Sequence, residues 1–529
     1  MIHTRSGRRG MVVAPHHLAS QAGLAVLRDG GNAIEAAVAA AAAVAVAYPH
    51  MTGIGGDGFW LVHEPGRAPV GIDASGRAAA RATIDFYRGR GCAAIAPRGP
   101  LAANTAAGAI SGWQIALDIS ARWGGRLPLA RLLADAIWLA REGTPATASQ
   151  ATYTSSFLEQ LKDVPGFAAT FLDAGRVPVP GTVRRYSALA TTLERLATAG
   201  LDDFYRGELG QAMAAELERL GSPLGREDLA SHRASVVEPL SVGLSVGRVF
   251  NMPPPTQGVA SLMILGIFDR LGCRATDGFE YVHSLVEATK QAFILRNRHV
   301  GNPGTMTVDP RSFLTDERLG SLARAIDPAT ALPWPQPSAQ GGTIWLGAID
   351  GAGRAASYIQ SVYWEFGSGT VLRDSGVMWQ NRGSSFVFDP ASPNRLAPGH
   401  KPFHTLNPAL AHLADGRVLV YGTMGGEGQP QSQAALFTRH AMFGQDLQAA
   451  ISAPRWLLGR TWGAESTTLK LEDRFPEELF AALRQAGHVV EVLPAYSDLV
   501  GHAHALSLHP SGRIEGATDP RADGSVAGY

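Results

Sequence analysis

The decisive stretch of this chain is QGGTIWLGAID, which occupies residues 340–350. The residues leading into it, 327–341, are rich in Pro, Ala, Gly and Ser and have little periodicity, which is typical of an exposed, mobile segment. The pattern changes at Thr343, where a short strand is predicted over Thr343–Ile349, followed by a turn and a second strand over Ala355–Phe366. The sequence therefore predicts a β-hairpin that begins at a Gly-Gly-Thr junction.

A threonine at such a junction has a chemical use. Its hydroxyl is a weak nucleophile that needs an adjacent base, and a threonine at a chain terminus supplies one, because an α-amine has a pKa of about 7.7–8.0. The same hydroxyl can create that terminus by attacking the carbonyl of Gly342, which gives an ester that water then opens. Glycine tolerates the strained backbone that this step needs. Taken alone, Gly-Gly-Thr before a strand is more typical of a simple turn, so the catalytic interpretation depends on the rest of the chain.

The first half of the chain is predicted to be mainly helical. Two helices are expected within residues 14–48, with Asn32 as the N-cap of the second. The glycine-rich loop 51–58 leads into a strand at Phe59–His63, and it is predicted to be a tight turn because it lacks the Lys-Ser/Thr pair and the βαβ context of a phosphate loop. Further helices are expected in 110–220, Val259–Leu271 and Phe279–Arg296, and further strands at Val418–Tyr421 and His488–Leu493. A helical half followed by a strand-led half indicates a layered α/β architecture.

Charge and hydropathy exclude several classes of function. The 529 residues carry 46 Lys+Arg and 46 Asp+Glu, so the basic excess typical of nucleic-acid or membrane-surface binding is missing. The longest apolar run, Ala36–Tyr48, is shorter than the ~20 residues of a membrane span, and we predict that it forms a buried core helix. No apolar signal-peptide core follows the basic N-terminus. We therefore expect a cytoplasmic protein with no nucleic-acid and no membrane partner.

Cysteine and histidine usage points to neither disulfides nor metals. Cys92 and Cys273 are expected to be buried free thiols, in keeping with a reducing compartment. The 16 histidines include no His-Glu-x-x-His or similar ligand spacing, and His16-His17 is interpreted as the entry to a helix. No metal and no cofactor is expected.

A series of motifs then occurs in order along nearly the whole chain. They are GGNAIEAA at 30–37 with Pro49-His50 and GIGG at 53–56; NMPPPTQG at 251–258; the segment 343–368; and GTMGG at 422–426. Together they resemble the gamma-glutamyltransferase family of N-terminal nucleophile hydrolases. The resemblance implies the α/β (α+β) fold class, as a four-layer αββα sandwich. It also implies self-cleavage into a large piece, 1–342, and a small piece, 343–529, that stay together as a heterodimer; pairing of two such heterodimers is left open.

The resemblance also implies the catalytic residues, position by position. Cleavage falls between Gly342 and Thr343, and Thr343 is then the nucleophile, with its amine as general base. Ser361 occupies the position of a hydroxyl that orients this amine. The backbone N–H groups near Gly425 and Gly426 hold the tetrahedral oxyanion, where the loss of one donor typically costs ~10²–10³ in rate.

Several positions depart from the transferases of the family. Those enzymes hold the α-carboxylate of glutamate with an arginine and its α-amine with an asparagine and two acids, and they carry paired serines on the next loop and a histidine two residues beyond the nucleophile. The corresponding residues here are, in the same order, Ser75; Tyr363, Arg382 and Ser385; His404 and Thr405; and Trp345. These departures predict a different substrate.

A cation at Arg382 inverts the electrostatics of the pocket. A guanidinium repels an ammonium and pairs bidentately with a carboxylate, so the substrate is expected to carry an anion. We expect it to be bound by Arg382, Tyr363, Ser385, His404 and Thr405, with the bulk of Trp345 and Tyr363 narrowing the space. The alternative is that Arg382 points away or pairs with a protein acid such as Glu365 or Glu427.

An amide beside a carboxylate in a small pocket suggests a short acid amide. The stretches 341–345, 363–369 and 381–385 are most similar to the oxamate amidohydrolases of the family, which hydrolyse oxamate to oxalate and ammonia in the use of purine-derived nitrogen. Three alternatives stay open: a gamma-glutamyl transferase or glutathione hydrolase; an acylase for glutaryl-type side chains of cephalosporins, which would also use Arg382; and a non-catalytic protein that keeps the fold. The intact Gly342-Thr343 and Gly425-Gly426 pairs oppose the last.

Overall fold

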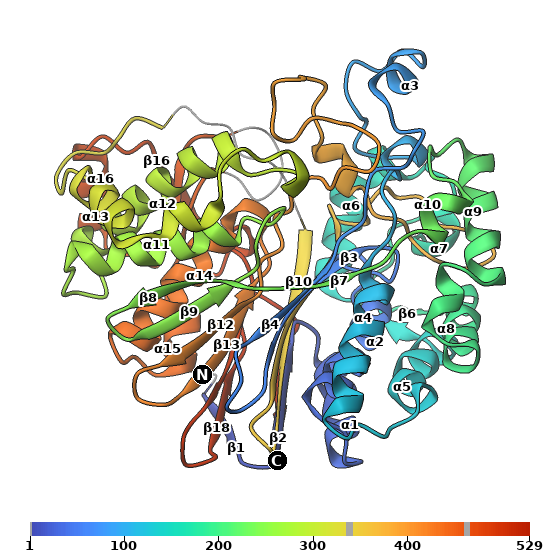
Figure 1. The fold of residues 1–529 in the computed structure, drawn as a ribbon, viewed down its shortest axis with the longest axis horizontal. Helices are drawn as coiled ribbons and strands as arrows, with labels where there is room; N and C mark the ends of the chain where they lie inside the picture. Colours follow the sequence, from blue (N-terminus) through green and yellow to red (C-terminus); the bar gives the residue numbers. More distant parts are fainter. Residues whose placement is uncertain (1–2, 335–341, 460–465) are drawn as a thin grey trace.

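The computed structural model describes residues 3–334, 342–459 and 466–529, and within these ranges two seven-stranded antiparallel sheets form the centre of the molecule. The sheet that contains the hairpin has the order β19-β2-β10-β11-β3-β4-β7. Its strands are β19 (Ser525–Gly528), β2 (Gly10–Ala14), β10 (Gly342–Asp350), β11 (Ala355–Tyr363), β3 (Asp57–His63), β4 (Val70–Ala74) and β7 (Ser235–Val237). In Figure 1, β10 (yellow) runs down the middle of the molecule.

The second sheet has the order β1-β18-β17-β13-β12-β9-β8. Its strands are β1 (Arg5–Gly7), β18 (Ile514–Ala517), β17 (Ala503–Leu508), β13 (Val418–Thr423), β12 (Ala409–Leu413), β9 (Gly247–Asn251) and β8 (Leu240–Leu244). Two smaller sheets pair β14 (Trp456–Leu458), β15 (Leu469–Glu472) and β16 (Val490–Leu493), and β5 (Thr144–Pro145) with β6 (Val183–Arg184).

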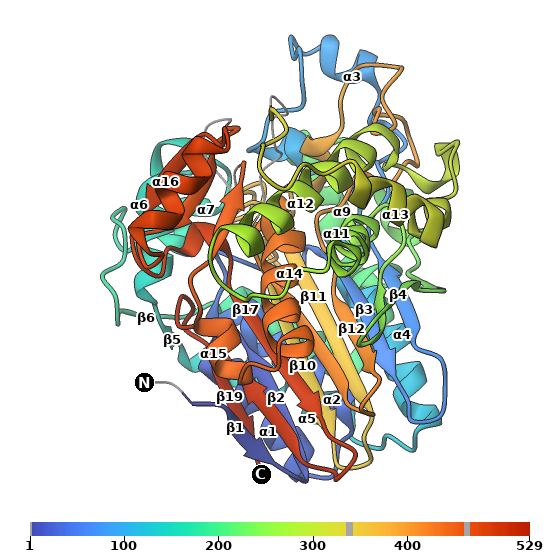
Figure 2. The same ribbon diagram turned by 90° about the vertical axis from the view of Figure 1, so that its left-hand side faces the viewer.

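Helices cover the outer face of each sheet. The hairpin sheet is covered by α1 (His17–Arg28), α2 (Ala33–Ala47) and α4 (Ala109–Arg122), and the second sheet by α11 (Gly258–Leu271), α14 (Gln429–Phe437) and α15 (Leu447–Ser452). These lie on opposite sides of the paired sheets in Figure 1, and Figure 2 shows α11, α14 and α15 in front of the strands. The remaining helices are α3 (Ile84–Arg88), α5 (Leu129–Glu142), α6 (Ala148–Leu161), α7 (Phe167–Phe171), α8 (Ser187–Ala199), α9 (Glu208–Leu220), α10 (Arg226–Ala230), α12 (Phe279–His299), α13 (Asp316–Arg324) and α16 (Glu477–Gln485). The predicted four-layer αββα sandwich is confirmed.

The alternation of side chains along β10 assigns its two faces. Trp345 and Ile349 pack into the apolar layer between the two sheets, whereas Ile344, Leu346 and Ala348 pack against the helices. Thr343 has the same parity as Trp345, so its side chain faces the layer between the sheets. The sequence pattern of the hairpin thus places Thr343 at the end of a central strand, within the sandwich.

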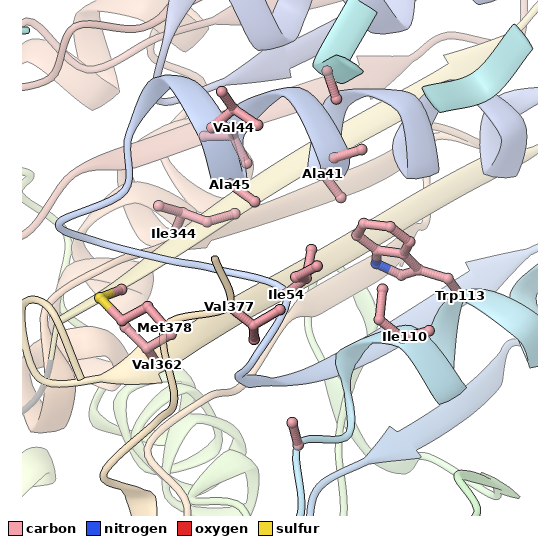
Figure 3. Packing of buried hydrophobic residues seen from close by; sticks show 14 of the residues in the cluster. Ala41, Val44, Ala45, Ile54, Ile110, Trp113, Ile344, Val362, Val377 and Met378 are labelled. Carbon is pink, nitrogen blue, oxygen red and sulfur yellow. The ribbon is translucent and has the colours of Figure 1, made fainter. Parts of the chain in front are cut away.

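The alanine-rich run forms the buried helix α2, as predicted. Asn32 is its N-cap: Asn32 Oδ1 accepts hydrogen bonds from Ile34 N at 3.0 Å and Glu35 N at 3.2 Å, and Glu35 Oε2 accepts one from Asn32 N at 2.8 Å. This is a capping box, which satisfies backbone groups that a buried helix end would otherwise leave unpaired. Figure 3 shows Ala41, Val44 and Ala45 of α2 in the same cluster as Ile344 of β10.

Replacing this cap tests how strongly α2 is anchored. Asn32→Ala is expected to lower the free energy of unfolding by about 0.5–2 kcal/mol, because loss of an N-cap side chain costs that much. The measurement is a urea titration of Asn32→Ala against wild type. Ser120→Ala is the control, since Ser120 Oγ accepts only the second bond of this side chain, from Asn32 Nδ2 at 2.7 Å. An unchanged midpoint in Asn32→Ala would contradict the role of the cap.

Four sequence expectations need correction. The second hairpin strand ends at Tyr363 rather than Phe366, because Tyr363 adopts φ +83 and leaves the sheet. The strand predicted at His488–Leu493 begins at Val490 and belongs to the small sheet. The segment from 327 is tied down in part, since Ala331 is buried and Ala331 N donates to Ala486 O at 2.7 Å. Both cysteines are free but half-buried.

Residues 335–341, including Gln340 and Gly341 of the predicted junction, lie outside the described residues. None of the helices within the described ranges combines the length and the apolar character needed to cross a bilayer.

Candidate active site

Thr343 lies on a central strand and contacts a second hydroxyl. Its side chain is 1% exposed, and Thr343 Oγ1 donates to Ser361 Oγ at 3.3 Å. Ser361 comes from the neighbouring strand β11, and Ser361 Oγ also accepts a hydrogen bond from Tyr363 N at 2.8 Å. The register between β10 and β11 shifts between Gly342 and Ile344: Gly342 lies opposite Tyr363 and Ile344 opposite Gln360, so the extra residue of this bulge is on β11. The structure thus brings Thr343 and Ser361 together, as the sequence predicted.

The glycine-rich loop 51–58 packs against the backbone of Ser361. A Cβ on Gly56 would lie 2.0 Å from the carbonyl oxygen of Ser361, so the two backbones meet at a distance that only glycine allows. The predicted tight turn packed under a sheet is correct, and its use is to let the loop before β3 close on the strand that carries Ser361.

The loop of Gly425 and Gly426 follows β13 on the facing sheet. Gly425 has φ +127 and Gly426 has φ +52, two successive conformations that favour glycine. A Cβ on Gly422 would lie 2.2 Å from the indole of Trp345, so the end of β13 lies directly against the start of β10. The loop therefore leaves β13 at the end of the sandwich where Thr343 begins its strand, and it leads through Gly426–Gly428 into α14.

Trp345 does not act as the sequence suggested. Its indole belongs to the apolar layer between the sheets, and Trp345 Nε1 donates to Ser357 Oγ at 3.0 Å. It forms part of the core beside Gly422 rather than of the surroundings of Arg382, whereas Tyr363 lies directly against Arg382.

Arg382 is buried at the site. It opens the short 3₁₀ turn Arg382–Ser385, is 1% exposed, and its guanidinium carbon lies 3.3 Å from the centroid of the Tyr363 ring, in stacking contact. Arg382 Nη1 donates to Thr405 Oγ1 at 3.1 Å, whereas Nε and Nη2 have no hydrogen-bond partner within the described part of the chain. Burial lowers the pKa of Arg382, and interactions with Tyr363, Asp57 and Glu427 act in the opposite direction. Two buried donors of a guanidinium are thus available to an anion.

Neither of the two acids proposed as alternative partners of Arg382 forms an ion pair with it in the described part of the chain. Glu427 Oε2 accepts a hydrogen bond from Arg296 Nη2, and both side chains are buried. Glu365 is buried near Arg98, and burial raises the pKa of Glu365 to about 7, with the Arg98 charge lowering it in part. Glu427 is therefore paired with Arg296, whereas Glu365 lies in the field of the Arg98 charge without an ion pair among the described residues.

Tyr363 carries backbone strain at the centre of this arrangement. A positive φ is unusual for an aromatic residue and is found where surrounding structure imposes it, often at functional sites. Here φ +83 turns the chain so that Tyr363 N reaches Ser361 Oγ and the Tyr363 ring lies against Arg382. Through this conformation Tyr363 contacts both Ser361 and Arg382.

His404 and Thr405 lie in the loop that faces Arg382. Gln257 Nε2 bridges the carbonyl oxygens of Thr405 and Gly426, with 2.8 Å to each, so this loop and the glycine loop are held together. Burial, followed by the Arg382 charge, lowers the pKa of His404 well below its usual range. The structure thus brings Thr405 into contact with Arg382 and places His404 beside it.

Ser385 and Ser75 have mainly structural contacts. Ser385 is half-buried, and its hydroxyl donates to the Phe403 carbonyl at 3.4 Å, which ties the 3₁₀ turn to the next loop. Ser75 Oγ donates to Asp73 Oδ1 at 2.6 Å. Asp73 in turn pairs with Lys401 at 2.7 Å, and this pairing accounts for the lowered pKa of Asp73 despite its burial. We find no direct contact that places Ser385 beside Thr343 in the residues that the structure describes.

Sequence reasoning missed Asp57 and its partner. Asp57 Oδ2 lies 3.0 Å from His404 Nε2, and Asp57 Oδ1 accepts from Gln380 Nε2, Gly76 N and Gly108 N at 2.9–3.1 Å. An acid at the head of the otherwise apolar strand 57–63 was the available signal, because a fully buried carboxylate requires partners. Its partner could not be found, since His404 is 347 residues away.

One group of side chains has the composition of a metal site. His283, Glu287 and His488 are buried, and one ligand atom from each lies within 4.8 Å of the others. Lys290 Nζ already lies 2.7 Å from Glu287 Oε1, and His283 Nδ1 is hydrogen-bonded to His488 Nε2 at 2.9 Å. The ammonium supplies the cation that the carboxylate needs, so we interpret the cluster as a structural network that joins α12 to the chain near His488.

Comparisons with known proteins agree with this geometry. The family model described as gamma-glutamyltranspeptidase matches residues 19–529. The chain is 56% identical to an oxamate amidohydrolase proenzyme of Klebsiella pneumoniae, over 98% of each chain, and 39% identical to a glutathione hydrolase-like proenzyme of Bacillus subtilis, over 99% of each. Among solved structures, a cephalosporin acylase from Bacillus halodurans superposes with a TM-score of 0.92 at 34% identity, covering 100% of this chain and 97% of the acylase.

Proposed function

Because this chain belongs to the gamma-glutamyltranspeptidase family of amide hydrolases, we propose that it cleaves itself between Gly342 and Thr343 and then hydrolyses a small carboxylate-bearing amide, with oxamate as the substrate. The observation that carries the substrate class is Arg382, a buried guanidinium whose Nε and Nη2 have no hydrogen-bond partner within the described ranges. A buried cation of this kind is stabilised by an anionic ligand.

The processing step uses the same atoms as catalysis. Thr343 Oγ1 adds to the carbonyl carbon of Gly342, the Gly342–Thr343 C–N bond breaks, and the hydroxyl proton passes to the nitrogen, which becomes the free α-amine of Thr343. Water then opens the resulting ester to give the Gly342 carboxylate and the Thr343 hydroxyl. The bond to Ser361 Oγ holds the threonine hydroxyl at the head of the strand, in keeping with Ser361 orienting the nucleophile and its amine.

Turnover of oxamate follows the same path. The α-amine of Thr343 accepts the hydroxyl proton as Oγ1 adds to the amide carbon, and the negative charge on the amide oxygen is held by backbone N–H groups near Gly425 and Gly426. The amine returns the proton to the leaving nitrogen, and ammonia departs from an oxalyl ester on Thr343. Water, deprotonated by the amine, attacks this ester, and oxalate is released with the threonine hydroxyl restored.

The two pieces produced by cleavage are interleaved. In the hairpin sheet, β10 and β11 of the small piece, 343–529, lie between β2 and β3 of the large piece, 1–342. Separation would break the ladders on both sides of the hairpin and expose the apolar layer between the sheets. We therefore expect the processed protein to be a stable heterodimer of its own two chains. A cytoplasmic location and a place in the use of purine-derived nitrogen stay predictions.

A substrate panel separates the three enzymatic hypotheses. Purified protein is expected to release ammonia from oxamate and to give little colour from gamma-glutamyl-p-nitroanilide, because the ammonium end of a glutamyl group would meet Arg382. A glutaryl amide is expected to be poor, since Tyr363 stacked on Arg382 shortens the pocket. Efficient turnover of the gamma-glutamyl compound would show a transferase or glutathione hydrolase, and preference for the glutaryl amide would show an acylase.

A further inference from the structure

His404 and Asp57 form a buried pair, and within the described residues the second ring nitrogen of His404, Nδ1, has no hydrogen-bond partner. Asp57 is 0% and His404 1% exposed, and Asp57 Oδ2 lies 3.0 Å from His404 Nε2. The other carboxylate oxygen accepts three N–H donors, from Gln380, Gly76 and Gly108. Burial raises the pKa of Asp57 to about 6, although these three donors act to lower it, so the carboxylate is ionised at neutral pH and above. His404 Nε2 therefore carries the proton shared with Asp57, and His404 Nδ1 is left as a bare lone pair.

His404 Nδ1 shares its surroundings with Arg382. It has no hydrogen-bond partner in the described part of the structure, as is also true of Arg382 Nε and Nη2. Thr405, the neighbour of His404, holds Arg382 Nη1, and the guanidinium interacts electrostatically with both His404 and Asp57. One anionic ligand could therefore meet the two guanidinium donors and the imidazole.

A bare imidazole nitrogen cannot bind an anion until it is protonated, because its lone pair and a carboxylate oxygen are both acceptors. We propose that the Asp57–His404 pair takes up one proton when the substrate anion binds, so that His404 becomes an imidazolium between Asp57 and the substrate carboxylate. His404 is then a binding residue, and Asp57 acts through it as a positioning residue. This inference rests on the anionic substrate of the proposed function.

The charges around the pair favour this uptake. The groups that face it are Arg382 from the turn after residue 381, Asp73 of β4 with its partner Lys401, and His232. Burial lowers the pKa of His232 to about 4, so it is neutral at physiological pH. With Asp57 and Asp73 negative and Arg382 and Lys401 positive, the free cluster has no net charge. A monoanion alone would leave a buried net negative charge, and one proton on His404 removes it.

The direction of the pH dependence follows by linkage. In the free enzyme the pKa of His404 lies well below its usual range because of burial and Arg382, so His404 is neutral at neutral pH. The bound anion raises the pKa of His404. Anion affinity therefore falls as pH rises from the pKa of His404 in the free enzyme to its pKa in the complex, by up to about tenfold per pH unit for one linked proton.

The experiment uses processed wild-type enzyme and oxalate as a non-reacting anion. Calorimetric binding at about pH 8, where a free imidazole is neutral, is carried out in two buffers with different ionisation enthalpies, which gives the number of protons taken up. Oxalate carries two negative charges at this pH, and the carboxylate that meets Arg382 is the one expected to draw a proton onto His404. The expected result is therefore one proton per oxalate that depends on His404. Oxalate binding without proton uptake would overturn the inference, as would the absence of oxalate binding in an enzyme that hydrolyses oxamate.

Two substitutions of His404 test the roles of its two ring nitrogens separately. His404→Asn places an amide N–H near the position of Nδ1 and is expected to bind oxalate without proton uptake. His404→Gln places its amide near the position of Nε2, keeps the Asp57 contact, and is expected to lose at least tenfold in affinity. Proton uptake that persists in His404→Asn would come from another group, such as the Thr343 amine, and would overturn the proposal. The matched control is His412→Gln, since His412 is another histidine that is hydrogen-bonded to a side chain of β3, here His63 at 3.1 Å. His63 lies at the opposite end of β3 from Asp57, away from the site.

Asp57→Asn provides the second variant, which is needed if the His404 variants do not process themselves. Without the carboxylate charge the imidazolium loses its partner, so proton uptake at about pH 8 is expected to disappear while processing continues. Unchanged uptake in Asp57→Asn would contradict the role of Asp57. The proposed function is judged separately by ammonia release from oxamate: if that fails but oxalate-linked uptake depends on His404, the anion site stands and the amide substrate is a different one.

Discussion

Thr343→Ala is expected to remain a single chain of 55.7 kDa and to release no ammonia from any amide. Wild-type protein should instead give pieces of about 36 and about 20 kDa, which is the total mass divided in proportion to 342 and 187 residues. One hydroxyl performs both reactions in our mechanism, so both are lost together. Removal of a covalent nucleophile costs roughly 10⁶-fold in kcat, which is below detection in an ammonia assay. Denaturing electrophoresis, intact mass and ammonia release are the measurements.

Thr343→Ser is the matched control, because it keeps the hydroxyl and loses only a methyl group. It is expected to cleave itself, more slowly, and to retain part of the activity. The mature small chain should begin at residue 343 by N-terminal sequencing. Wild-type protein that is uncut yet active would overturn the mechanism. Cleavage at any other bond would mean that a residue other than Thr343 is the nucleophile.

The fold was largely predictable because its strongest signals are local. The hairpin at Thr343 is encoded by alternating apolar residues around a turn, and α2 by an alanine-rich run behind an Asn32–Glu35 capping box. Each needs only short-range rules of periodicity and capping. The end of β11 was not predictable in this way, because the positive φ of Tyr363 depends on its contacts with Ser361 and Arg382.

The candidate site was predictable only where a motif carried it. Thr343 and Ser361 lie within one hairpin, so their contact follows from the register of two adjacent strands. Asp57 and His404 come from the two different pieces of the chain. A buried carboxylate predicts that some partner is present, but the sequence does not indicate which residue it is. Trp345 was misplaced for the same reason: its neighbour Gly422 lies on the other sheet, and no local pattern shows that the two sheets touch there.

Arg382→Ala is expected to lower kcat/KM for oxamate roughly 10- to 150-fold, since a charge-assisted hydrogen bond to an anion contributes about 1.5–3 kcal/mol and about 1.36 kcal/mol corresponds to tenfold. Self-cleavage is expected to survive, because that step needs Thr343 and its oxyanion donors and involves no substrate carboxylate. Arg382→Glu should be worse than alanine, as it places a like charge beside the substrate. Steady-state ammonia release across an oxamate titration, with electrophoresis to confirm processing, gives both readouts.

The control for Arg382 is Arg373→Ala, which removes an exposed arginine nine residues earlier in the chain and is expected to leave kcat/KM unchanged. Arg382→Lys tests geometry separately from charge. An ammonium keeps the attraction for a carboxylate but cannot stack on Tyr363 or present two parallel donors, so this variant should fall between wild type and alanine. If Arg382→Ala hydrolyses oxamate as well as wild type, the two guanidinium donors without partners are not the anion site. The carboxylate must then be bound elsewhere, and Lys401 is another buried cation that interacts with His404.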